Sequence, residues 1–441
     1  MSVALRPVVV GAGWSGLACA IELVRLGHRP IVLDAAPHAG GRGRSFDHVL
    51  GGAKLRLDNG QHLLLGAYGD TLDLMRAVGV APAAALLRRP FALVYPDGWR
   101  LAAAPLPAPW HLAAGLLMAH GLTPAERWSM VAWSRRQARQ GWHAPADANA
   151  ASLLAGEPAG LVRRLWRPLC LAALNVELAQ ASAQVFLNVL RDSLGGGARQ
   201  SHLLLPRCDL SAAFPDPAVD WLRAHGADVQ MNCLAQSLGI GIGASGGPHA
   251  IHCRDAAFTT DRLVLALPAD RAAALLQGAA AALAPAAAQL ARLRFAPIAT
   301  TYLRYAADTR LARPVLTLLD DPLQDEHGQW VFDRGATDPA MAGILSVVIS
   351  GEGPYRALDR AALGDSVARQ LRRVLGLPAP LAHYSVIEKH ATLVPAPGLV
   401  RPPARLPVSG VYLAGDAADS PYPSTLEGSV RAGLAAARAA A

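Results

Sequence analysis

The stretch VVVGAGWSGLACAIELVRLGHRPIVLD, Val8 to Asp34, decides the fold. A β-branched segment at Val8 to Val10 predicts a strand, and an apolar segment at Ile31 to Leu33 predicts a second one. Leu17 to Leu26, between them, has a helical composition, and Gly27 ends it. A strand, a helix and a strand in this order predict one unit of a parallel sheet in an α/β protein.

The turn between the first strand and the helix is a GxGxxG motif, Gly11-Ala12-Gly13-Trp14-Ser15-Gly16. Gly11 makes the turn, Gly13 lets the backbone approach a pyrophosphate, and Gly16 permits close packing of the helix. The helix N-terminus offers unpaired N–H groups and a positive dipole end to a phosphate. Asp34, at the end of the second strand, can accept hydrogen bonds from ribose hydroxyls. The stretch therefore predicts a dinucleotide site.

A second GxGxxG match, residues 241 to 246, provides a control within the same chain. It leads into GPHAIHCRD and not into a helix, so it lacks the N–H groups that a phosphate needs. Its glycine density is typical of a flexible hairpin loop.

Length and composition set the broad class. A chain of 441 residues favours two domains, and 52% hydrophobic against 17% charged residues indicates an apolar ligand. The five cysteines form no CxxC pair, so neither a metal site nor a disulfide framework is indicated.

A net charge of +8 without a basic run among aromatics speaks against nucleic acid and fits an anionic membrane surface or a phosphorylated ligand. No signal peptide is recognised, so we expect a cytoplasmic protein.

The segment GGRGRS, Gly40 to Ser45, extends the fingerprint. Closely spaced arginines and glycine N–H groups make a phosphate clamp. The segment resembles the FAD-binding signature of the flavin amine oxidase and phytoene desaturase superfamily. The resemblance implies that Gly41 and Arg42, with Arg44 and Ser45, contact the FAD phosphates and ribose.

The segment GVYLAGDAADSPYPSTLEGSVRAGLAAA, Gly410 to Ala437, is similar to the closing FAD motif of the same superfamily. The resemblance implies that Asp416, after Gly415, binds the ribityl chain. It also implies that a helix starting near Ser424 or Thr425 points its N-terminus at the flavin, with Leu426 and Glu427 in its first turn. Plain helix capping would explain Thr425 and Glu427 equally well.

The resemblance also implies a domain plan. HGADVQMNCLAQSL resembles the strand that meets adenine, which assigns Ala235 to the cofactor, and no Cys or His after His390 offers a covalent flavin link, so FAD is expected to be noncovalent. We expect an α/β fold with a Rossmann-like FAD-binding domain of residues 1–85, 200–295 and 390–441. An α+β substrate domain of residues 86–199 and 296–389 interleaves with it.

A polar cluster, Asp58-Asn59-Gly60-Gln61-His62, stands against an apolar run in LDNGQHLLLGAY, Leu57 to Tyr68. Asp-Asn-Gly supplies the left-handed backbone of a tight turn, so the local pattern predicts a hairpin. In the superfamily this segment passes the isoalloxazine ring, which implies that Gly60 and Gln61 contact the cofactor. The two interpretations are compatible.

More specific stretches resemble one family, the hydroxysqualene dehydroxylases of hopanoid biosynthesis. They are Leu57 to Tyr68, Arg167 to Leu194, Leu203 to Leu222, and SPYPSTLEGSVRAG, Ser420 to Gly433. The resemblance implies that hydroxysqualene, a long-chain isoprenoid, is reduced to squalene with loss of water, and that reduced FAD (FADH2) gives the hydride. The sequence indicates no second dinucleotide site, so the external electron donor stays unidentified.

Loss of an allylic hydroxyl needs an acid beside the flavin in a dry apolar site. His62 is the first candidate, because histidine can donate a proton near neutral pH. Asp58, Asp419 and Tyr422 are the alternatives.

Three other functions share the superfamily. A carotenoid desaturase moves hydride to the flavin, and the sequence does not show the direction of electron flow. Many amine oxidases carry a lysine on a strand that FAPIATTYLRY resembles, but Ala299, Thr300 and Thr301 stand there. Escort proteins for prenylated GTPases hold isoprenoids without catalysis, and the joint presence of Asp34, Arg42 and Asp416 argues against a pure carrier.

Leu101 to Ala125 carries no charged residue, but its prolines break it, and Trp110 to Met118 is too short to span a membrane. Tryptophans and arginines between Arg127 and Trp142 suit an amphipathic helix lying on a bilayer, peripheral to the inner face of the cytoplasmic membrane. A substrate-domain helix packed on its own core has the same apolar stripe.

Overall fold

The computed structural model describes residues 5–241 and 247–441. The predicted strand-helix-strand unit is present as β1 (Val8–Val10), α1 (Trp14–Arg25) and β2 (Ile31–Leu33). β1 and β2 pair in parallel, with Val8 opposite Ile31. Gly27 follows α1 with a φ of 89°, a left-handed conformation that glycine adopts without strain. The elements predicted for this stretch are confirmed.

A five-stranded parallel sheet forms the base of the molecule, in the order β10-β2-β1-β14-β20. The added strands are β10 (Asp228–Gln230), β14 (Leu263–Leu265) and β20 (Val411–Leu413). Side chains alternate across it: Val9 packs in the core with α1, α2 (Gly69–Ala77), α11 (Pro215–Ala224) and α15 (Leu426–Ala440). Val8 and Val10 pack on the other face with α12 (Ala269–Leu276) and α13 (Ala284–Ala291). The sheet is therefore buried on both faces, as parallel sheets are.

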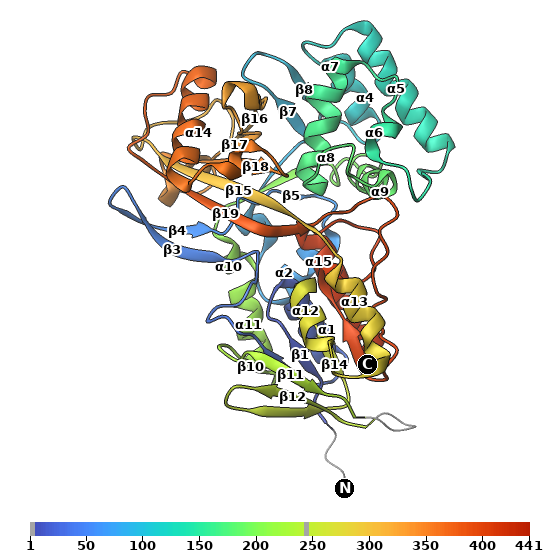
Figure 1. The fold of residues 1–441 in the computed structure, drawn as a ribbon. Helices are drawn as coiled ribbons and strands as arrows, with labels where there is room; N and C mark the ends of the chain where they lie inside the picture. The colour runs from blue at the N-terminus through green and yellow to red at the C-terminus, as the bar shows by residue number, and fades with distance from the viewer. Residues whose placement is uncertain (1–4, 242–246) are drawn as a thin grey trace.

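A five-stranded antiparallel sheet lies above this base. Its order is β16 (Val315–Thr317), β17 (Trp330–Asp333), β18 (Ile344–Ser350), β15 (Phe295–Arg304) and β19 (Ala382–Leu393), with α14 (Arg360–Leu375) packed against it. Beside it stand α4 (Trp110–Leu117), α5 (Pro124–Arg139), α6 (Ala150–Leu153), α7 (Ala159–Leu161), α8 (Arg167–Leu174) and α9 (Ala183–Ser193). In Figure 1 the long pair β15 and β19 runs diagonally between the two halves.

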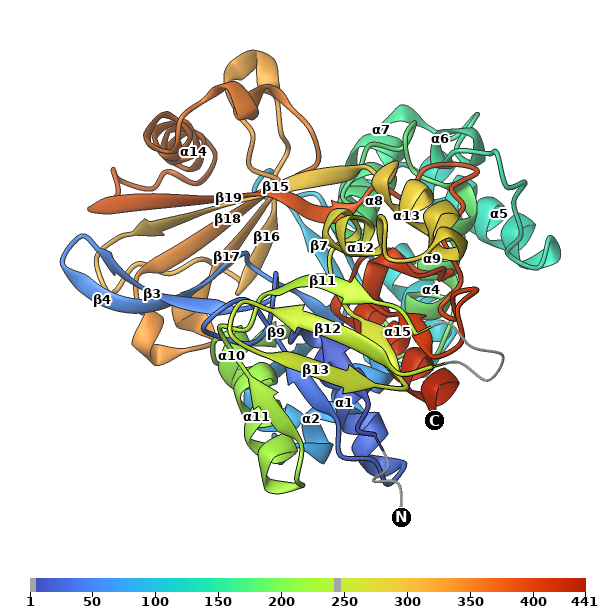
Figure 2. The same cartoon turned by 60° about the horizontal axis from the view of Figure 1, so that its bottom comes forward.

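Smaller sheets complete the fold. A hairpin of β3 (Ser45–Leu50) and β4 (Ala53–Asp58) reaches up beside β19, and β5 (Leu64–Leu65), β9 (Leu203–Pro206) and β6 (Leu86–Arg89) form a three-stranded sheet. β7 (Ala92–Val94) and β8 (Arg100–Ala102) pair, as do β11 (Ala235–Gly239), β12 (His249–Cys253) and β13 (Ala257–Thr260), which cross the front of Figure 2. The α/β class and the interleaved course of the chain agree with expectation; the residue boundaries stay a prediction.

The hairpin turn predicted at Asp58 to Gly60 is wrong. β4 pairs with β3 and β5 pairs with β9, so the two strands flanking this segment do not pair with each other. Gly60 does not adopt a left-handed backbone. The polar side chains that favour a turn in the local sequence instead bond to distant strands, as described below, and tertiary contacts override the local preference.

Most of the second GxGxxG match, residues 242–246, lies outside the described residues. The strands on either side, β11 and β12, pair antiparallel with Gly239 opposite Ala250.

The uncharged stretch Leu101 to Ala125 contains the end of β8, α4 and the first residues of α5. Across residues 5–241 and 247–441, no helix combines the length and the apolar character that crossing a membrane requires.

Candidate active site

The three glycines of the first fingerprint differ in the space around them. A Cβ at Gly16 would stand 1.8 Å from the Gly11 carbonyl oxygen, and a Cβ at Gly11 would stand 2.3 Å from the Ala266 carbonyl oxygen. At Gly13 the nearest atom is the Gly41 Cα, 3.9 Å away. Gly11 and Gly16 therefore serve packing, whereas Gly13 leaves an open side for a ligand phosphate.

Ser15 and Asp34 flank this open side. The Ser15 hydroxyl is buried and has no hydrogen-bond partner, although Ser15 lines the cavity. The Asp34 carboxylate accepts from the Ala12 N–H at 2.6 Å and from the Ala36 N–H at 2.8 Å, which fixes it at the mouth of the turn. A buried hydroxyl without a partner indicates a missing acceptor, and a nucleotide phosphate fits this position.

An ion pair joins the two ends of the chain. Arg42 Nη2 lies 2.7 Å from Asp416 Oδ2, and the Asp416 side chain is almost fully buried. The Arg42 guanidinium also donates to the Ala391 carbonyl at 3.0 Å. Arg44, close by, donates to the Gly41 carbonyl at 2.8 Å. The pair thus holds two segments, both expected to contact FAD, on one wall of the cavity.

The C-terminal motif folds as its sequence predicts. α15 begins at Leu426, and the Thr425 hydroxyl caps it by accepting from the Gly428 N–H at 3.0 Å. The Glu427 carboxylate accepts from the N–H and hydroxyl of Thr71, at 2.9 and 2.7 Å, and so caps α2. Glu427 lies at the cavity wall, but its oxygens are used to join two helices.

Most residues expected to bind the cofactor meet in one cavity of about 1180 Å³. They are Gly11, Gly13, Trp14, Ser15, Asp34, Gly41, Arg42, Arg44, Gly60, Gln61, Ala235, Gly415, Asp416, Thr425, Leu426 and Glu427. Gly16 and Ser45 lie behind the wall, where the Ser45 hydroxyl donates to Asp58 Oδ1 at 2.8 Å. The volume exceeds the range of about 300 to 1,000 Å³ typical of one ligand, so a second ligand can share the cavity.

The far end of the cavity is apolar. It is lined by Phe91 and by side chains from β7, α8, α9 and β17, among them Leu93, Leu171, Phe186, Leu190 and Phe332. These residues belong to the core cluster of the helical part, so the same side chains that stabilise this part also form the wall. Such a wall excludes water and suits a hydrocarbon chain.

His62 also lines this cavity. Its Nδ1 lies 2.7 Å from the Gly60 carbonyl oxygen, which can only accept, so Nδ1 carries the proton and Nε2 is free to accept. Burial lowers the pKa of the His62 ring, against the opposing effects of the Gly60 carbonyl and of Asp58. The neutral form therefore prevails near neutral pH.

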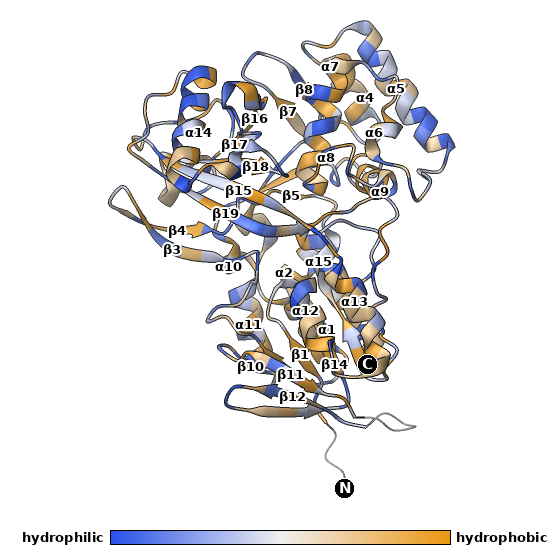
Figure 3. Cartoon of the chain, in the orientation of Figure 1, coloured by the Kyte–Doolittle hydropathy of each residue, from blue (hydrophilic) through white to orange (hydrophobic). Residues whose placement is uncertain are grey.

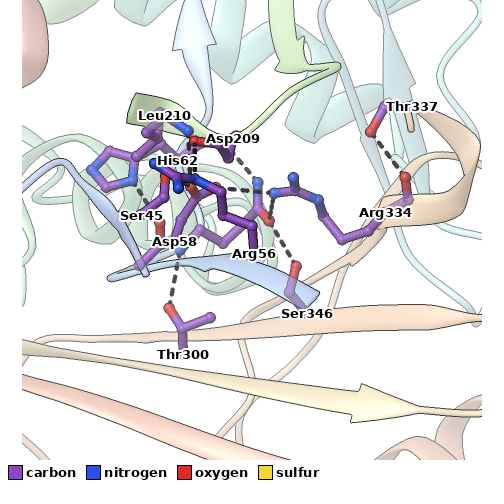
Figure 4. Close-up of polar contacts among 12 residues, drawn as sticks. Ser45, Arg56, Asp58, His62, Asp209, Leu210, Thr300, Arg334, Thr337 and Ser346 are labelled. Carbon is purple, nitrogen blue, oxygen red and sulfur yellow. Dashed lines mark hydrogen bonds and ion pairs between the residues drawn. The ribbon is translucent and has the colours of Figure 1, made fainter. Parts of the chain in front are cut away.

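Asp58 is tied into the wall and does not line the cavity. Its carboxylate accepts from the Leu210 N–H at 2.8 Å and pairs with Arg334 Nη1 at 3.3 Å, both charged side chains being buried (Figure 4). Arg334 also donates to Gln61 Oε1 at 2.8 Å, as does the Ser346 hydroxyl. The network fixes the segment from Asp58 to His62 against β15 and β18.

The other two acid candidates, Asp419 and Tyr422, differ in whether they line the main cavity. Asp419 is exposed and lines a smaller neighbouring cavity. Tyr422 lines both cavities, and its hydroxyl donates to Asp192 Oδ2 at 2.6 Å. Sequence reasoning missed Asp192, which lies on α9 in RDSL, because an acidic residue near a helix end resembles an ordinary surface residue.

The fold, with the phosphate turn and the Arg42–Asp416 pair at one cavity, defines a flavin-dependent oxidoreductase. The model of the flavin containing amine oxidoreductase family matches residues 14–441. A hydroxysqualene dehydroxylase of Rhodopseudomonas palustris is 30% identical over 97% of this chain and 96% of that protein. One of Sinorhizobium fredii is 29% identical with the same coverage of both chains.

Partial and structural matches agree with this class. A probable zeta-carotene desaturase of Synechococcus elongatus is 37% identical, but over 75 residues, or 17% of this chain. The crystal structure of an oxidoreductase from Methanosarcina mazei superposes with a TM-score of 0.74 at 16% identity, covering 98% of this chain and 99% of that one. The chain belongs to the flavin containing amine oxidoreductase family and, within it, to the hydroxysqualene dehydroxylases.

Proposed function

We propose that the protein removes the hydroxyl of hydroxysqualene reductively, giving squalene and water. The observation that carries the proposal is one continuous cavity, in which the residues expected to bind the dinucleotide and the apolar end both form the wall. Bound reduced FAD supplies the hydride in this chemistry. The chain's own residues hold the cofactor at the Arg42 and Asp416 end, keep water from the reacting carbon, and supply the proton that the leaving oxygen needs.

His62 stays a candidate for the group beside the reacting hydroxyl. Its Nε2 can accept a hydrogen bond from that hydroxyl in the neutral form and can donate only after the ring is protonated. Because burial lowers the pKa of His62, we expect the accepting role near neutral pH.

The test is anaerobic. The flavin of the purified protein is reduced, hydroxysqualene is added, and flavin absorbance is followed while the hydrocarbon is extracted and identified. Squalene formed in step with flavin reoxidation is the expected result. A flavin that stays reduced in the presence of bound hydroxysqualene would contradict the proposal.

A polyene desaturase is the second candidate, favoured by the partial match to zeta-carotene desaturases. It would use the same clamp and apolar end with the opposite direction of hydride movement. Reduction of oxidised flavin on addition of a polyene, without any reaction of hydroxysqualene, is the result that would favour it.

We further propose that the protein binds the membrane surface through α4 and α5. Trp110, Leu117 and Trp128 are 64%, 73% and 67% exposed, which is unusual for side chains of this size. Arginines between Arg127 and Arg139 accompany them, and much of α5 is coloured hydrophilic in Figure 3. Exposed tryptophan beside arginine suits an interface with anionic lipid.

Vesicle sedimentation tests this surface. Wild-type protein should sediment with anionic vesicles and much less with neutral ones, and replacing Trp110 and Trp128 with serine should abolish sedimentation without changing flavin content. A double variant that sediments like wild type would contradict the proposal.

A further inference from the structure

Two residues that line the main cavity carry a buried polar atom without a hydrogen-bond partner among the described residues. One is Ser15, whose hydroxyl lies at the phosphate turn, and the other is Trp330, whose indole N–H lies on β17. Trp330 belongs to the same core cluster as Phe186 and Leu190 of the apolar end. Because buried donors are normally paired, each end of the cavity contains one polar atom that a ligand can satisfy.

The side chain of Trp330 faces the cavity and is held firmly there. Side chains alternate along a strand, so Trp330 and Phe332 line the cavity while Val331 packs with α14 on the opposite face of the sheet. The Trp330 side chain is enclosed, with the residue only 6% exposed. An indole in such close packing cannot rotate its N–H toward a different acceptor, as a hydroxyl can.

A row of three opposed residues leads from Trp330 toward the segment that carries His62. Trp330 lies opposite Val348 on β18, and Val348 lies opposite Thr300 on β15. Two strand spacings, or about 10 Å, therefore separate the backbones of Trp330 and Thr300. A Cβ at Gly60 would lie 3.8 Å from Thr300 Oγ1 and equally far from Cε1 of the His62 ring. The His62 ring and the Trp330 indole thus lie over the same face of this sheet.

These two groups have complementary hydrogen-bonding capacity. Nε2 of neutral His62 can accept, whereas the Trp330 indole can only donate. An alcohol both donates and accepts, so its hydroxyl can satisfy both groups. A hydrocarbon offers no acceptor, and covering the indole N–H with it carries the cost of an unpaired buried donor.

We propose that Trp330 recognises the oxygen of the substrate by donating its indole N–H, so that the cavity prefers an oxygenated isoprenoid to a hydrocarbon of the same length. The inference rests on the proposed function and deepens it, because it names the group that distinguishes substrate from product. Once the oxygen has left, the N–H is again unpaired, and the hydrocarbon product binds more weakly. Trp330 determines specificity and supplies no proton to the reaction.

The test measures binding to protein that contains oxidised FAD, which has no hydride to give. Three ligands share one carbon chain: hydroxysqualene, the ketone with its oxygen on the same carbon, and squalene. The ketone accepts hydrogen bonds but cannot donate, so His62 Nε2 adds nothing to its binding and only a donor on the protein recognises it. The Kd of each ligand is obtained from the change in flavin absorbance in one detergent, whose uptake of ligand is the same for every protein variant.

Three variants separate the indole N–H from its surroundings. Trp330→Phe removes the N–H and keeps an aromatic ring. Trp166→Phe is the matched control, because Trp166 is also buried, also has an unpartnered indole N–H and belongs to the same core cluster, but does not line the cavity. Ser350→Ala removes an alternative donor, a hydroxyl at the end of β18 that does line it.

We expect wild-type protein to bind hydroxysqualene and the ketone more tightly than squalene. Trp330→Phe should reduce both preferences by about three- to tenfold, the worth of one neutral hydrogen bond. Trp166→Phe and Ser350→Ala should keep the wild-type preferences. Flavin content measures folding, and Trp330→Leu takes the place of Trp330→Phe if the latter loses flavin.

Unchanged preferences in Trp330→Phe would overturn the inference, as would an equal loss in Trp166→Phe or Ser350→Ala. A ketone that binds wild-type protein no more tightly than squalene would overturn it without any variant. None of these measurements needs turnover, whereas the proposed function fails if wild-type protein with reduced flavin forms no squalene. The two failures are therefore distinguishable.

Discussion

At the cofactor end of the cavity the groups that face the ligand belong largely to the backbone of two short segments, Gly11 to Gly16 and Gly40 to Arg44. At the apolar end the polar groups are a few side chains, Asp192 and Tyr422 above all, from segments far apart in the sequence. The first end depends on backbone conformation, which glycines determine locally. The second depends on how helices pack, so the two ends should respond differently to substitution.

The glycine pair Gly16 and Gly13 gives the largest expected effect. Gly16→Ala should prevent folding, because its Cβ would lie 1.8 Å from a backbone oxygen that cannot move. Gly13→Ala should fold, because the nearest atom is 3.9 Å away, yet lose flavin, because the methyl group occupies the open side of the turn. Soluble yield, a thermal melt of the apoprotein and the flavin-to-protein ratio check both outcomes. A Gly13→Ala protein with full flavin would remove the phosphate from this position.

Loss of the charged groups of the clamp should have the next largest effect. Asp416→Ala leaves Arg42 without its carboxylate, and Asp34→Ala frees the Ala12 N–H. A hydrogen bond to a charged group is worth about 1.5 to 3 kcal/mol, so FAD affinity should fall by about 10 to 100-fold in each. Titration of apoprotein with FAD measures this. Unchanged affinity in both variants would contradict the cofactor assignment.

His62→Ala tests the junction between the two ends. It should leave flavin content unchanged, because the ring bonds to its own loop through the Gly60 carbonyl. Turnover of hydroxysqualene should fall by about tenfold or more through loss of the group that orients the hydroxyl. Unchanged single-turnover rates would remove His62 from the mechanism. If the variant slows turnover of hydroxysqualene but not of its acetate ester, whose leaving group needs no strong acid, His62 is the acid.

His111, in the helical part, gives the smallest expected effect. It is 2% exposed, neither ring nitrogen has a partner, and burial lowers its pKa. The unfolded chain binds a proton near pH 6.5 that the folded state resists, so stability is full above that pH and falls as pH decreases through it.

His111→Leu should raise the free energy of unfolding by about 1 kcal/mol and flatten its decrease between pH 7 and 5. Urea unfolding at both pH values measures it. An equally steep decrease in the variant would show that other groups set the acid sensitivity.

The predicted parts of the site share one property. The phosphate turn, the Arg42 element and the α15 motif are each read from a few consecutive residues whose types a backbone conformation requires. The structure brings nearly all of them to one cavity. Gly16 and Ser45 are the exceptions: Gly16 packs against the Gly11 carbonyl, and the Ser45 hydroxyl turns to Asp58 behind the wall.

Predictions from side-chain type alone were less successful. Asp58-Asn59-Gly60 has the composition of a turn, but the Asp58 carboxylate binds Arg334 and the Leu210 N–H, and the segment connects two different sheets without forming a hairpin. Asp58 and Asp419 look like acids in the sequence, yet neither lines the main cavity. Asp192 lines it and has no distinguishing local pattern.

The sequence by itself determined the βαβ unit, the glycine turn and the α15 cap, because each follows from local backbone requirements within a short stretch. The flavin class followed from the resemblance of these motifs to a known superfamily. Only the tertiary structure decided which side chains meet at the apolar end. Tyr422 and Asp192 are 230 positions apart. Their contact exists because α9 packs against the loop before α15, and packing between distant elements depends on the whole core and not on any one stretch.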